Sequence, residues 1–194
     1  MKQDIQKISR ELSFEENIRD YRLNFQSTWG LFSPKKIDEG SRLLLDKVKV
    51  NVSDRILDLG CGFGALGVVL AKIALEGRVD MIDKDFVAVR YANKNIKLNH
   101  IVNAEAYLSN LFDQIEENKK FDLIVSNLPA KVSKEMFWIM FDDMKRYLDK
   151  DGRVYLVIIR GLKKFIKRSL KENFGNCKRV AYNKNYILYM AKKE

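Results

Sequence analysis

The stretch RILDLGCGFGALG, residues 55–67, joins a predicted strand to a predicted helix through a turn that contains three glycines. The strand is expected over Arg55–Leu59 and the helix over Ala65–Leu75. Glycines at this place let the backbone turn sharply and approach a ligand closely, and the first turn of the helix offers free N–H groups. This order of strand, glycine turn and helix predicts a nucleotide-binding turn in an α/β protein.

The rest of the chain alternates apolar, β-branched runs with segments of helical period. Further strands are expected at Arg78–Ile82, Ala104–Leu108, Phe121–Ser126, Val154–Ile159, Cys177–Tyr182 and Tyr186–Met190. Further helices are expected at Asp38–Val48, Phe86–Leu98, Lys134–Leu148 and Leu162–Asn173. This βαβ order predicts a Rossmann-like α/β fold with a mostly parallel sheet.

Both ends of the chain depart from that alternation. The last two predicted strands are separated by Asn183 and Lys184, so we expect them to form an antiparallel hairpin. Near the other end, Tyr21–Thr28 is a candidate strand and Asp4–Ile18 a candidate helix. We therefore expect one domain over residues 1–194, in which residues 1–50 form an amino-terminal extension and an entry segment for substrate and cofactor.

Composition limits the function classes. The chain has 194 residues, 46% of them hydrophobic, 32% charged and only 2 of them Pro, which is typical of one folded domain. No apolar stretch approaches the roughly 20 residues that a membrane span needs, and no signal peptide is recognisable, so we expect a cytoplasmic protein. Two cysteines and one histidine predict neither a disulfide framework nor a metal site. A monomer or weak homodimer is the expected state.

The positive charge is concentrated in the last third of the chain. The net charge is +10; residues 1–130 hold 19 basic and 19 acidic residues, whereas residues 131–194 hold 17 basic and 7 acidic ones. Arg160, Lys163, Lys164, Lys167, Arg168 and Lys171 share one predicted helix face. This pattern is typical either of a solvated helix surface or of a surface that binds a polyanion. As the polyanion, RNA or DNA is favoured over an anionic membrane.

Two acidic residues lie at the carboxyl ends of the first two predicted strands of the βαβ order. Asp58 precedes the glycine turn, where a carboxylate is poorly suited to a pyrophosphate but well suited to an α-amino group. Asp83 lies about 20 residues beyond the glycines, at the spacing of a carboxylate that accepts hydrogen bonds from a ribose diol. Together they favour an amino-acid-bearing nucleotide over NAD, the alternative being two ordinary turn residues.

A third polar group follows the predicted strand Phe121–Ser126. Asn127-Leu128-Pro129 comes directly after it, and ligands of open α/β sheets sit outside the carboxyl ends of the strands. The Asn127 amide and the Leu128 carbonyl, fixed by Pro129, can accept hydrogen bonds from a planar amine and orient its lone pair. A plain strand-to-helix turn is the alternative interpretation.

These residues together resemble a known family, the class I S-adenosylmethionine-dependent methyltransferases of the Asn-(Pro/Leu)-Pro group, which modify exocyclic amines. Trp29-Gly30-Leu31-Phe32-Ser33-Pro34, Asp38-Glu39-Gly40-Ser41 and Ser109-Asn110-Leu111-Phe112 resemble the small methyltransferase domain of ribosomal RNA guanine-N2 methyltransferases. The resemblance runs from about Tyr21 to the carboxyl end of the chain.

The resemblance implies a seven-stranded sheet with an antiparallel last strand, S-adenosylmethionine as cofactor, and a guanine amine in ribosomal RNA or a ribosomal subunit as target. It also implies that the Asp38–Ser41 loop closes over the methionine end of the cofactor. The candidate cofactor-binding residues are Ser41, Asp58, Gly60, Cys61, Gly62, Gly64, Asp83, Lys84, Asn110 and Asn127. The candidate catalytic residues are Asn127, Leu128 and Pro129, and the candidate substrate-binding residues are Phe32, Lys131, Lys134, Arg160, Lys163, Lys164 and Lys167.

One position departs from the family pattern. The family places an aromatic residue directly after its Asn-Pro-Pro turn to stack on the target, whereas this chain has Ala130. Phe32 or Trp29 is a candidate replacement for that stacking surface. Two other functions stay open at this point: a protein methyltransferase that acts on a glutamine amide, and a non-catalytic RNA-binding or assembly protein that retains the fold.

Overall fold

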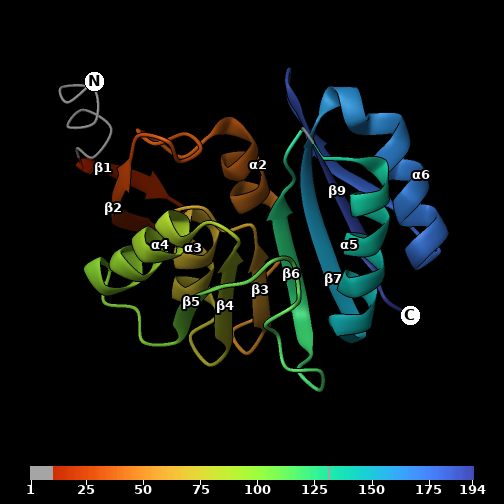
Figure 1. The fold of residues 1–194 in the computed structure, drawn as a ribbon, viewed down its shortest axis with the longest axis horizontal. Helices are drawn as coiled ribbons and strands as arrows, with labels where there is room; N and C mark the ends of the chain where they lie inside the picture. Colours follow the sequence, from red (N-terminus) through yellow and green to blue (C-terminus); the bar gives the residue numbers. More distant parts are fainter. Residues whose placement is uncertain (1–10, 131) are drawn as a thin grey trace.

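The computed structural model describes residues 11–130 and 132–194, and a seven-stranded sheet forms its centre (Figure 1). The strands of this sheet are β3 (Arg55–Leu59), β4 (Arg78–Asp83), β5 (Ala104–Leu108), β6 (Phe121–Asn127), β7 (Leu148–Ile159), β8 (Lys178–Tyr182) and β9 (Tyr186–Lys192). Their order across the sheet is β5-β4-β3-β6-β7-β9-β8. The pairs among β3 to β7 are parallel, and β9 pairs antiparallel with both β7 and β8.

Helices cover both faces of this sheet (Figure 1). They are α2 (Glu39–Lys47), α3 (Ala65–Ile73), α4 (Phe86–Leu98), α5 (Lys134–Tyr147) and α6 (Lys163–Phe174), with a short 3-10 helix η1 (Arg160–Leu162) before α6. The predicted α/β fold, its mostly parallel sheet and its antiparallel last strand are thus confirmed. No helix among the described residues is long and apolar enough to cross a membrane.

Alternation along the strands divides the core into two parts. In β3, Ile56 packs in the core under α2, α3 and α4, whereas its neighbour Leu57 packs in the core under α5 and α6. The same alternation places Val125 in the first core and Ile124 in the second. Because successive side chains point to opposite faces of a strand, each face of the sheet has its own apolar core.

The amino-terminal segment differs from its prediction. Glu11–Ile18 forms strand β1, which pairs antiparallel with β2 (Tyr21–Thr28) in a separate two-stranded sheet, so the predicted helix is wrong over these residues. Phe14 stacks on Phe25 of β2 at 5.6 Å between ring centroids, and this cross-strand contact favours the hairpin. The part of that prediction before Glu11 lies outside the described residues.

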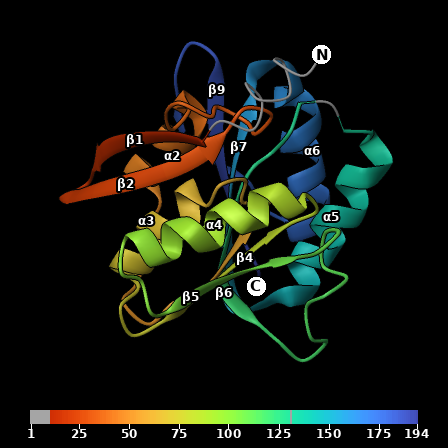
Figure 2. The ribbon, with the colours of Figure 1, turned by 60° about the vertical axis from the view of Figure 1, so that its left-hand side comes forward.

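The hairpin is attached to α4, beside which it lies in Figure 2. The Asn95 side-chain carbonyl accepts a hydrogen bond from the Gln26 backbone N–H at 2.7 Å, and Asn99 does the same for Asn24 at 3.0 Å. These bonds satisfy backbone groups of β2 that have no strand partner on that side. The segment that follows β2 is thereby held over the carboxyl end of the sheet, where the site lies.

Candidate active site

A cavity of about 540 Å³ opens at the carboxyl edge of the sheet, where the strand order reverses between β3 and β6. Its volume falls within the roughly 300 to 1,000 Å³ typical of small-molecule sites, and such a reversal is where open α/β sheets bind ligands. Among the residues that line it are Phe32, Ser41, Asp58, Gly60, Cys61, Gly62, Asp83, Lys84, Asn110, Asn127, Leu128, Pro129 and Ala130. Most of the predicted site residues therefore meet at one place.

The glycine turn forms the floor of the cavity. The backbone N–H groups of Gly60 and Cys61 both donate to the carbonyl of Ile82, at 2.9 and 3.0 Å, which ties the turn to β4. Gly60 and Gly62 have φ of +73° and +56°, and a Cβ at either position would meet no atom within 4 Å. Left-handed backbone favours glycine. Because glycine has no side chain, the turn exposes bare backbone to the open cavity.

Gly64 has a different role from the other two glycines. It is the N-cap residue of α3 with φ of +87°, and a Cβ there would lie 3.2 Å from Ala92 of α4. It does not line the cavity. Close packing of the turn against α4 is therefore the structural reason for a glycine at this position.

Asp58 is a buried carboxyl with one unused oxygen. Its side chain is 1% exposed; Oδ2 accepts a hydrogen bond from the Gly67 backbone N–H at 2.8 Å, while Oδ1 has no partner among the described residues. Burial raises the pKa of Asp58 to about 7, and the charge of Asp83 adds to this effect. A buried acceptor without a partner is costly, so the geometry favours a ligand that donates to Oδ1, above all a cationic amine.

Asp83 lies at the end of β4 beside the glycine turn. Its Oδ2 accepts from the Gly62 N–H at 2.9 Å and its Oδ1 from the Asp85 N–H at 3.0 Å. Each oxygen keeps a lone pair, so the carboxylate can still accept from two hydroxyl groups. Lys84 and Asn110 are exposed at the same rim, and the Asn110 amide donates to Asp113 at 3.2 Å.

Asn127 ends β6, and its amide is fixed by residues at the start of α2. Its Nδ2 donates to both carboxylate oxygens of Asp38 and to Oγ of Ser41, each at 3.1 Å. An ionised carboxylate only accepts hydrogen bonds, so the NH₂ group must face Asp38 and the carbonyl oxygen is left for another donor. Asp38 is itself the N-cap of α2, where it accepts from the N–H groups of Gly40 and Ser41.

The turn after Asn127 continues along the cavity wall. The Leu128 N–H donates to the carbonyl of Val157 at 3.0 Å, which holds this residue against β7. Leu128 is buried, whereas Pro129 and Ala130 are exposed. Ala130 therefore presents only a methyl group on this wall of the cavity.

The predicted substrate-binding residues are dispersed over the surface. Phe32 lines the cavity and is 65% exposed, so its ring is available to a ligand. Lys134 and Lys164 line a separate groove between α5 and α6. Arg160, Lys163 and Lys167 are exposed on η1 and α6 and line neither hollow; Lys131 lies outside the described residues.

Cys61 lines the cavity but has no features of a nucleophile. Burial, together with the charges of Asp58 and Asp83, raises the pKa of the Cys61 thiol well above its ordinary value. The thiol is therefore protonated at neutral pH, as expected of a small packing residue.

No group of three or more possible metal ligands occurs among residues 11–130 and 132–194.

Several lining residues could not be singled out from the sequence. Met136 and Met140 of α5, Ile159 of β7 and Tyr186 of β9 complete the apolar part of the cavity wall. Each looks like a core or surface residue in its own segment, and only the fold brings them together. The hydrogen bond between Asn127 and Asp38 likewise joins residues far apart in the chain, although each lies in a motif that is recognisable in the sequence.

Three structural features of the cavity fit S-adenosylmethionine. The unpartnered Oδ1 of Asp58 suits an α-amino group, the backbone exposed at Gly60 and Gly62 leaves room for close approach, and Asp83 suits a ribose diol. These three features lie along one wall of one cavity.

Comparison with known proteins agrees with this site. The Methyltransferase small domain family matches residues 22–190. An uncharacterised Bacillus subtilis protein, YbxB, is 32% identical over 95% of this chain and 93% of its own length. The ribosomal RNA small subunit methyltransferase C of Hamiltonella defensa is 32% identical over 84% of this chain, and the large subunit methyltransferase G of Shewanella denitrificans is 28% identical over 91%.

A solved structure is similar over nearly the whole chain. The T. thermophilus 16S rRNA N2 G1207 methyltransferase, in complex with S-adenosylmethionine and guanosine, superposes with a TM-score of 0.87 at 27% identity and covers 96% of this chain. This chain spans about half the length of these ribosomal RNA methyltransferases: 47% and 48% of the two curated relatives and 51% of the solved chain. The expected cofactor, S-adenosylmethionine, is confirmed for the family. The chain belongs to the methyltransferase small domain family.

Proposed function

We propose that this protein transfers a methyl group from S-adenosylmethionine to the exocyclic amine of a guanine in ribosomal RNA. One observation carries the proposal: Asn127 ends β6 with its NH₂ group held by Asp38 and Ser41, so its carbonyl oxygen is left to accept a hydrogen bond from a substrate amine. The ribosomal RNA methyltransferases among the relatives support the substrate class.

Three groups of this chain would hold the cofactor. Asp58 would accept a hydrogen bond from its amino group, Asp83 would accept from its ribose hydroxyls, and the backbone at Gly60 and Gly62 would lie against it. When bound, S-adenosylmethionine supplies a methyl group on a positively charged sulfur that leaves as a neutral thioether. Because the site is built at the end of β3 and β4, the cofactor's position is fixed by the sheet rather than by a mobile loop.

Two acceptors of the Asn127 turn would position the target amine. The Asn127 side-chain carbonyl and the Leu128 backbone carbonyl each accept one N–H of a planar amino group. The nitrogen lone pair of such an amine is delocalised into the base, and two hydrogen bonds that hold its N–H groups favour a pyramidal nitrogen whose lone pair is localised and faces the methyl group. After transfer, the methylated nitrogen loses one of these protons to solvent. This positioning is a near-attack arrangement of the kind that accounts for much of enzymatic rate enhancement.

The remaining cavity wall would contact the base itself. Phe32 presents an exposed ring at the cavity, and Ala130 leaves space at the family's usual aromatic position. A guanine inside a duplex must first leave the stack, and an aromatic surface lowers the cost of holding it outside. We therefore assign the stacking role to Phe32.

The test uses tritiated S-adenosylmethionine with the wild type and the Asn127→Ala variant. Unmodified ribosomal RNA, ribosomal subunits, transfer RNA and a protein extract are offered separately, and labelled RNA is digested to nucleosides to identify the base. Label in N2-methylguanosine from ribosomal RNA, with the wild type only, is the expected result. Label in protein would contradict the RNA substrate and support a protein side-chain amide as the methyl acceptor. Cofactor binding without methyl transfer to any of the four substrates would contradict an enzymatic role.

A further inference from the structure

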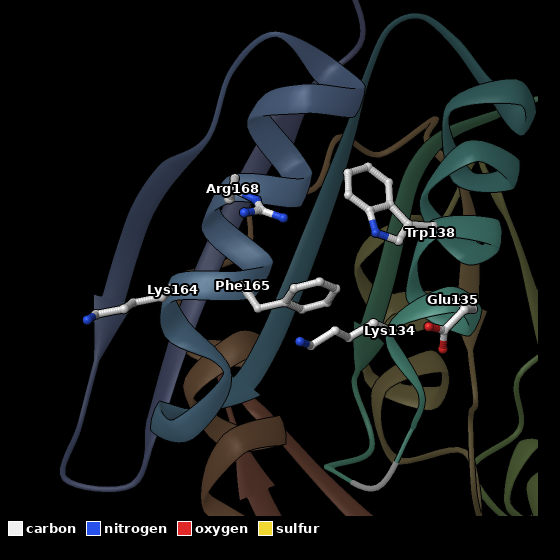
Figure 3. Close-up of a pocket in the computed structure, with 6 residues that line it drawn as sticks. All are labelled: Lys134, Glu135, Trp138, Lys164, Phe165 and Arg168. Atoms are coloured by element: carbon white, nitrogen blue, oxygen red, sulfur yellow. The ribbon is translucent and has the colours of Figure 1, made fainter.

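A second hollow lies between α5 and α6, outside the candidate active site. It has a volume of about 460 Å³ and is lined by Lys134, Glu135, Trp138, Lys164, Phe165 and Arg168. Figure 3 shows Trp138 and Lys134 of α5 directed toward Phe165 and Arg168 of α6, with Lys164 on the outer side of α6. We call this hollow the α5–α6 groove.

The aromatic residues of the groove form a supported apolar floor. Phe165 packs on Phe137 at 5.8 Å between ring centroids, so its ring is held from beneath by the core. Trp138 is only partly buried, and its indole N–H has no acceptor among the described residues. A flat apolar surface with an unused donor suits a ligand that is itself flat and polar at its edge, such as a nucleobase.

The charges of the groove favour an anionic ligand. Lys134 lies with its Nζ 6.0 Å from the centre of the Phe165 ring, and neither Lys134 nor Lys164 forms an ion pair with any described residue. Arg168 has a weak contact with Glu172 at 3.5 Å, in which both side chains are well exposed. The backbone N–H of Glu135 and the Ser133 side chain at the start of α5 lower the pKa of the Glu135 carboxyl.

The groove and the active-site cavity flank the same two turns of α5. Met136 and Met140 line the cavity, whereas Lys134 and Trp138 line the groove. At 3.6 residues per turn these two pairs lie on opposite sides of the helix. The start of α5 therefore lies between the two hollows.

The geometry points to the α5–α6 groove as a binding site for a single-stranded stretch of RNA next to the target nucleotide. Phosphates contact Lys134, Arg168 and Lys164, and one base stacks on Trp138. This inference rests on the proposed RNA substrate and adds the surface that holds the strand outside the cavity. Cations that flank an aromatic ring are typical of single-strand sites, whereas an acidic peptide would need the cations without the ring.

The first experiment follows Trp138 by fluorescence. The sequence has 2 tryptophans, so a Trp29→Phe background leaves Trp138 alone. A 12-nucleotide single-stranded RNA of uridines with one central guanosine is titrated in, with a 12-residue polyglutamate peptide as the competing ligand class. Quenching of Trp138 by the RNA, and not by the peptide, is expected. RNA that binds without changing this fluorescence would overturn the groove assignment and leave the proposed function intact.

The second experiment removes the charges and the ring separately. Lys134→Gln with Arg168→Gln should lower the slope of log affinity against log salt by about 1.4, at about 0.7 per phosphate contact. The matched control, Arg90→Gln with Lys97→Gln on α4, loses the same charge from exposed positions and should leave the slope unchanged. Equal slopes for the two double variants would overturn the proposal.

Trp138→Ala should weaken binding of the same RNA at least about fivefold, and Trp138→Phe should restore most of the loss. Thermal melting checks that both variants fold, and a calorimetric titration checks that both still bind S-adenosylmethionine. If the wild type binds the cofactor but no RNA of any kind, the proposed substrate itself fails. If Trp138→Ala binds RNA as well as the wild type, only the groove assignment fails.

Discussion

The central sheet has an amino edge, where its parallel strands begin, and a carboxyl edge, where they end. The same kinds of side chain have opposite roles at these two edges. At the amino edge, Arg55 forms ion pairs with Asp122 at 2.8 Å and with Asp149 at 2.6 Å. Arg153 pairs with Asp54 at 2.6 Å. Each of these carboxylates is paired with a guanidinium of the same chain, so the charges at this end of the strands are satisfied within the protein.

At the carboxyl edge the polar groups are only half used. Asp58 keeps a buried oxygen without a partner, Asn127 keeps its carbonyl oxygen, and Gly60 and Gly62 leave open space beside bare backbone. Such groups cost folding free energy and are retained where a ligand completes them. The comparison predicts that substitutions at the amino edge change stability, and that substitutions at the carboxyl edge change binding and turnover.

Among substitutions at the two edges, Asn127→Ala at the carboxyl edge is expected to have the largest effect, which is on the rate of methyl transfer. Loss of the amide removes one acceptor of the target amine, so the rate of methyl transfer should fall by about a thousandfold. Affinity for S-adenosylmethionine should stay within a few-fold, because Asp58 and Asp83 are untouched. Single-turnover transfer of label measures the rate; a variant with near-normal turnover would remove Asn127 from the mechanism.

At the other edge, Arg153→Met should act on stability alone. It leaves the buried Asp54 carboxylate, which is 4% exposed, without its guanidinium partner at 2.6 Å. We expect the free energy of unfolding to fall by about 2 kcal/mol. Urea denaturation measures this loss and calorimetry measures cofactor affinity, which should be unchanged; a variant of normal stability with weakened cofactor binding would reverse the proposed division.

Asp38→Asn tests whether orientation of the Asn127 amide matters. Asparagine still caps α2, but its own NH₂ group can face that of Asn127, so the Asn127 amide is free to turn its carbonyl away from the target. Turnover should fall about tenfold with little change in stability or in the KM for S-adenosylmethionine. Asp46→Asn, an exposed position near the end of the same helix, is the matched control; equal turnover of the two variants would contradict a positioning role.

The pH dependence of cofactor binding sharpens the role of Asp58. Its pKa is raised to about 7 by burial, so the carboxylate that the cofactor's amino group needs is lost as the pH falls below 7. Affinity for S-adenosylmethionine should fall by about tenfold between pH 6.5 and pH 5.5, since one proton must leave for each cofactor bound. Without ligand the sign is reversed for stability: the unfolded chain ionises Asp58 first, so stability decreases as the pH rises from about 4 to 7.

Much of this architecture could be predicted from the sequence, because the strands alternate with helices and their ends carry the polar residues. The strands β3 to β6 and the glycine turn follow from local patterns that tertiary contacts reinforce. Asp58, Asp83 and Asn127 share one cavity because parallel strands bring their carboxyl ends to one edge.

The failures have physical causes too. Glu11–Ile18 was expected to be helical, and its strand depends on pairing with β2 and on the contact between Phe14 and Phe25, which no local pattern specifies. The α5–α6 groove was missed for a similar reason: Trp138 and Arg168 become neighbours only when two helices pack side by side. Gly64 has the motif's spacing, but its close contact is with α4 instead of the cavity.

The most direct test of the two-edge account makes the same chemical change at each edge. S-adenosylmethionine is titrated calorimetrically at pH 8 into Asp58→Asn and Asp122→Asn, which stand at the carboxyl and amino edges of neighbouring strands. The account predicts that Asp58→Asn binds the cofactor at least about tenfold more weakly than the wild type, and that Asp122→Asn binds it within twofold. Equal affinities for the two variants would contradict it.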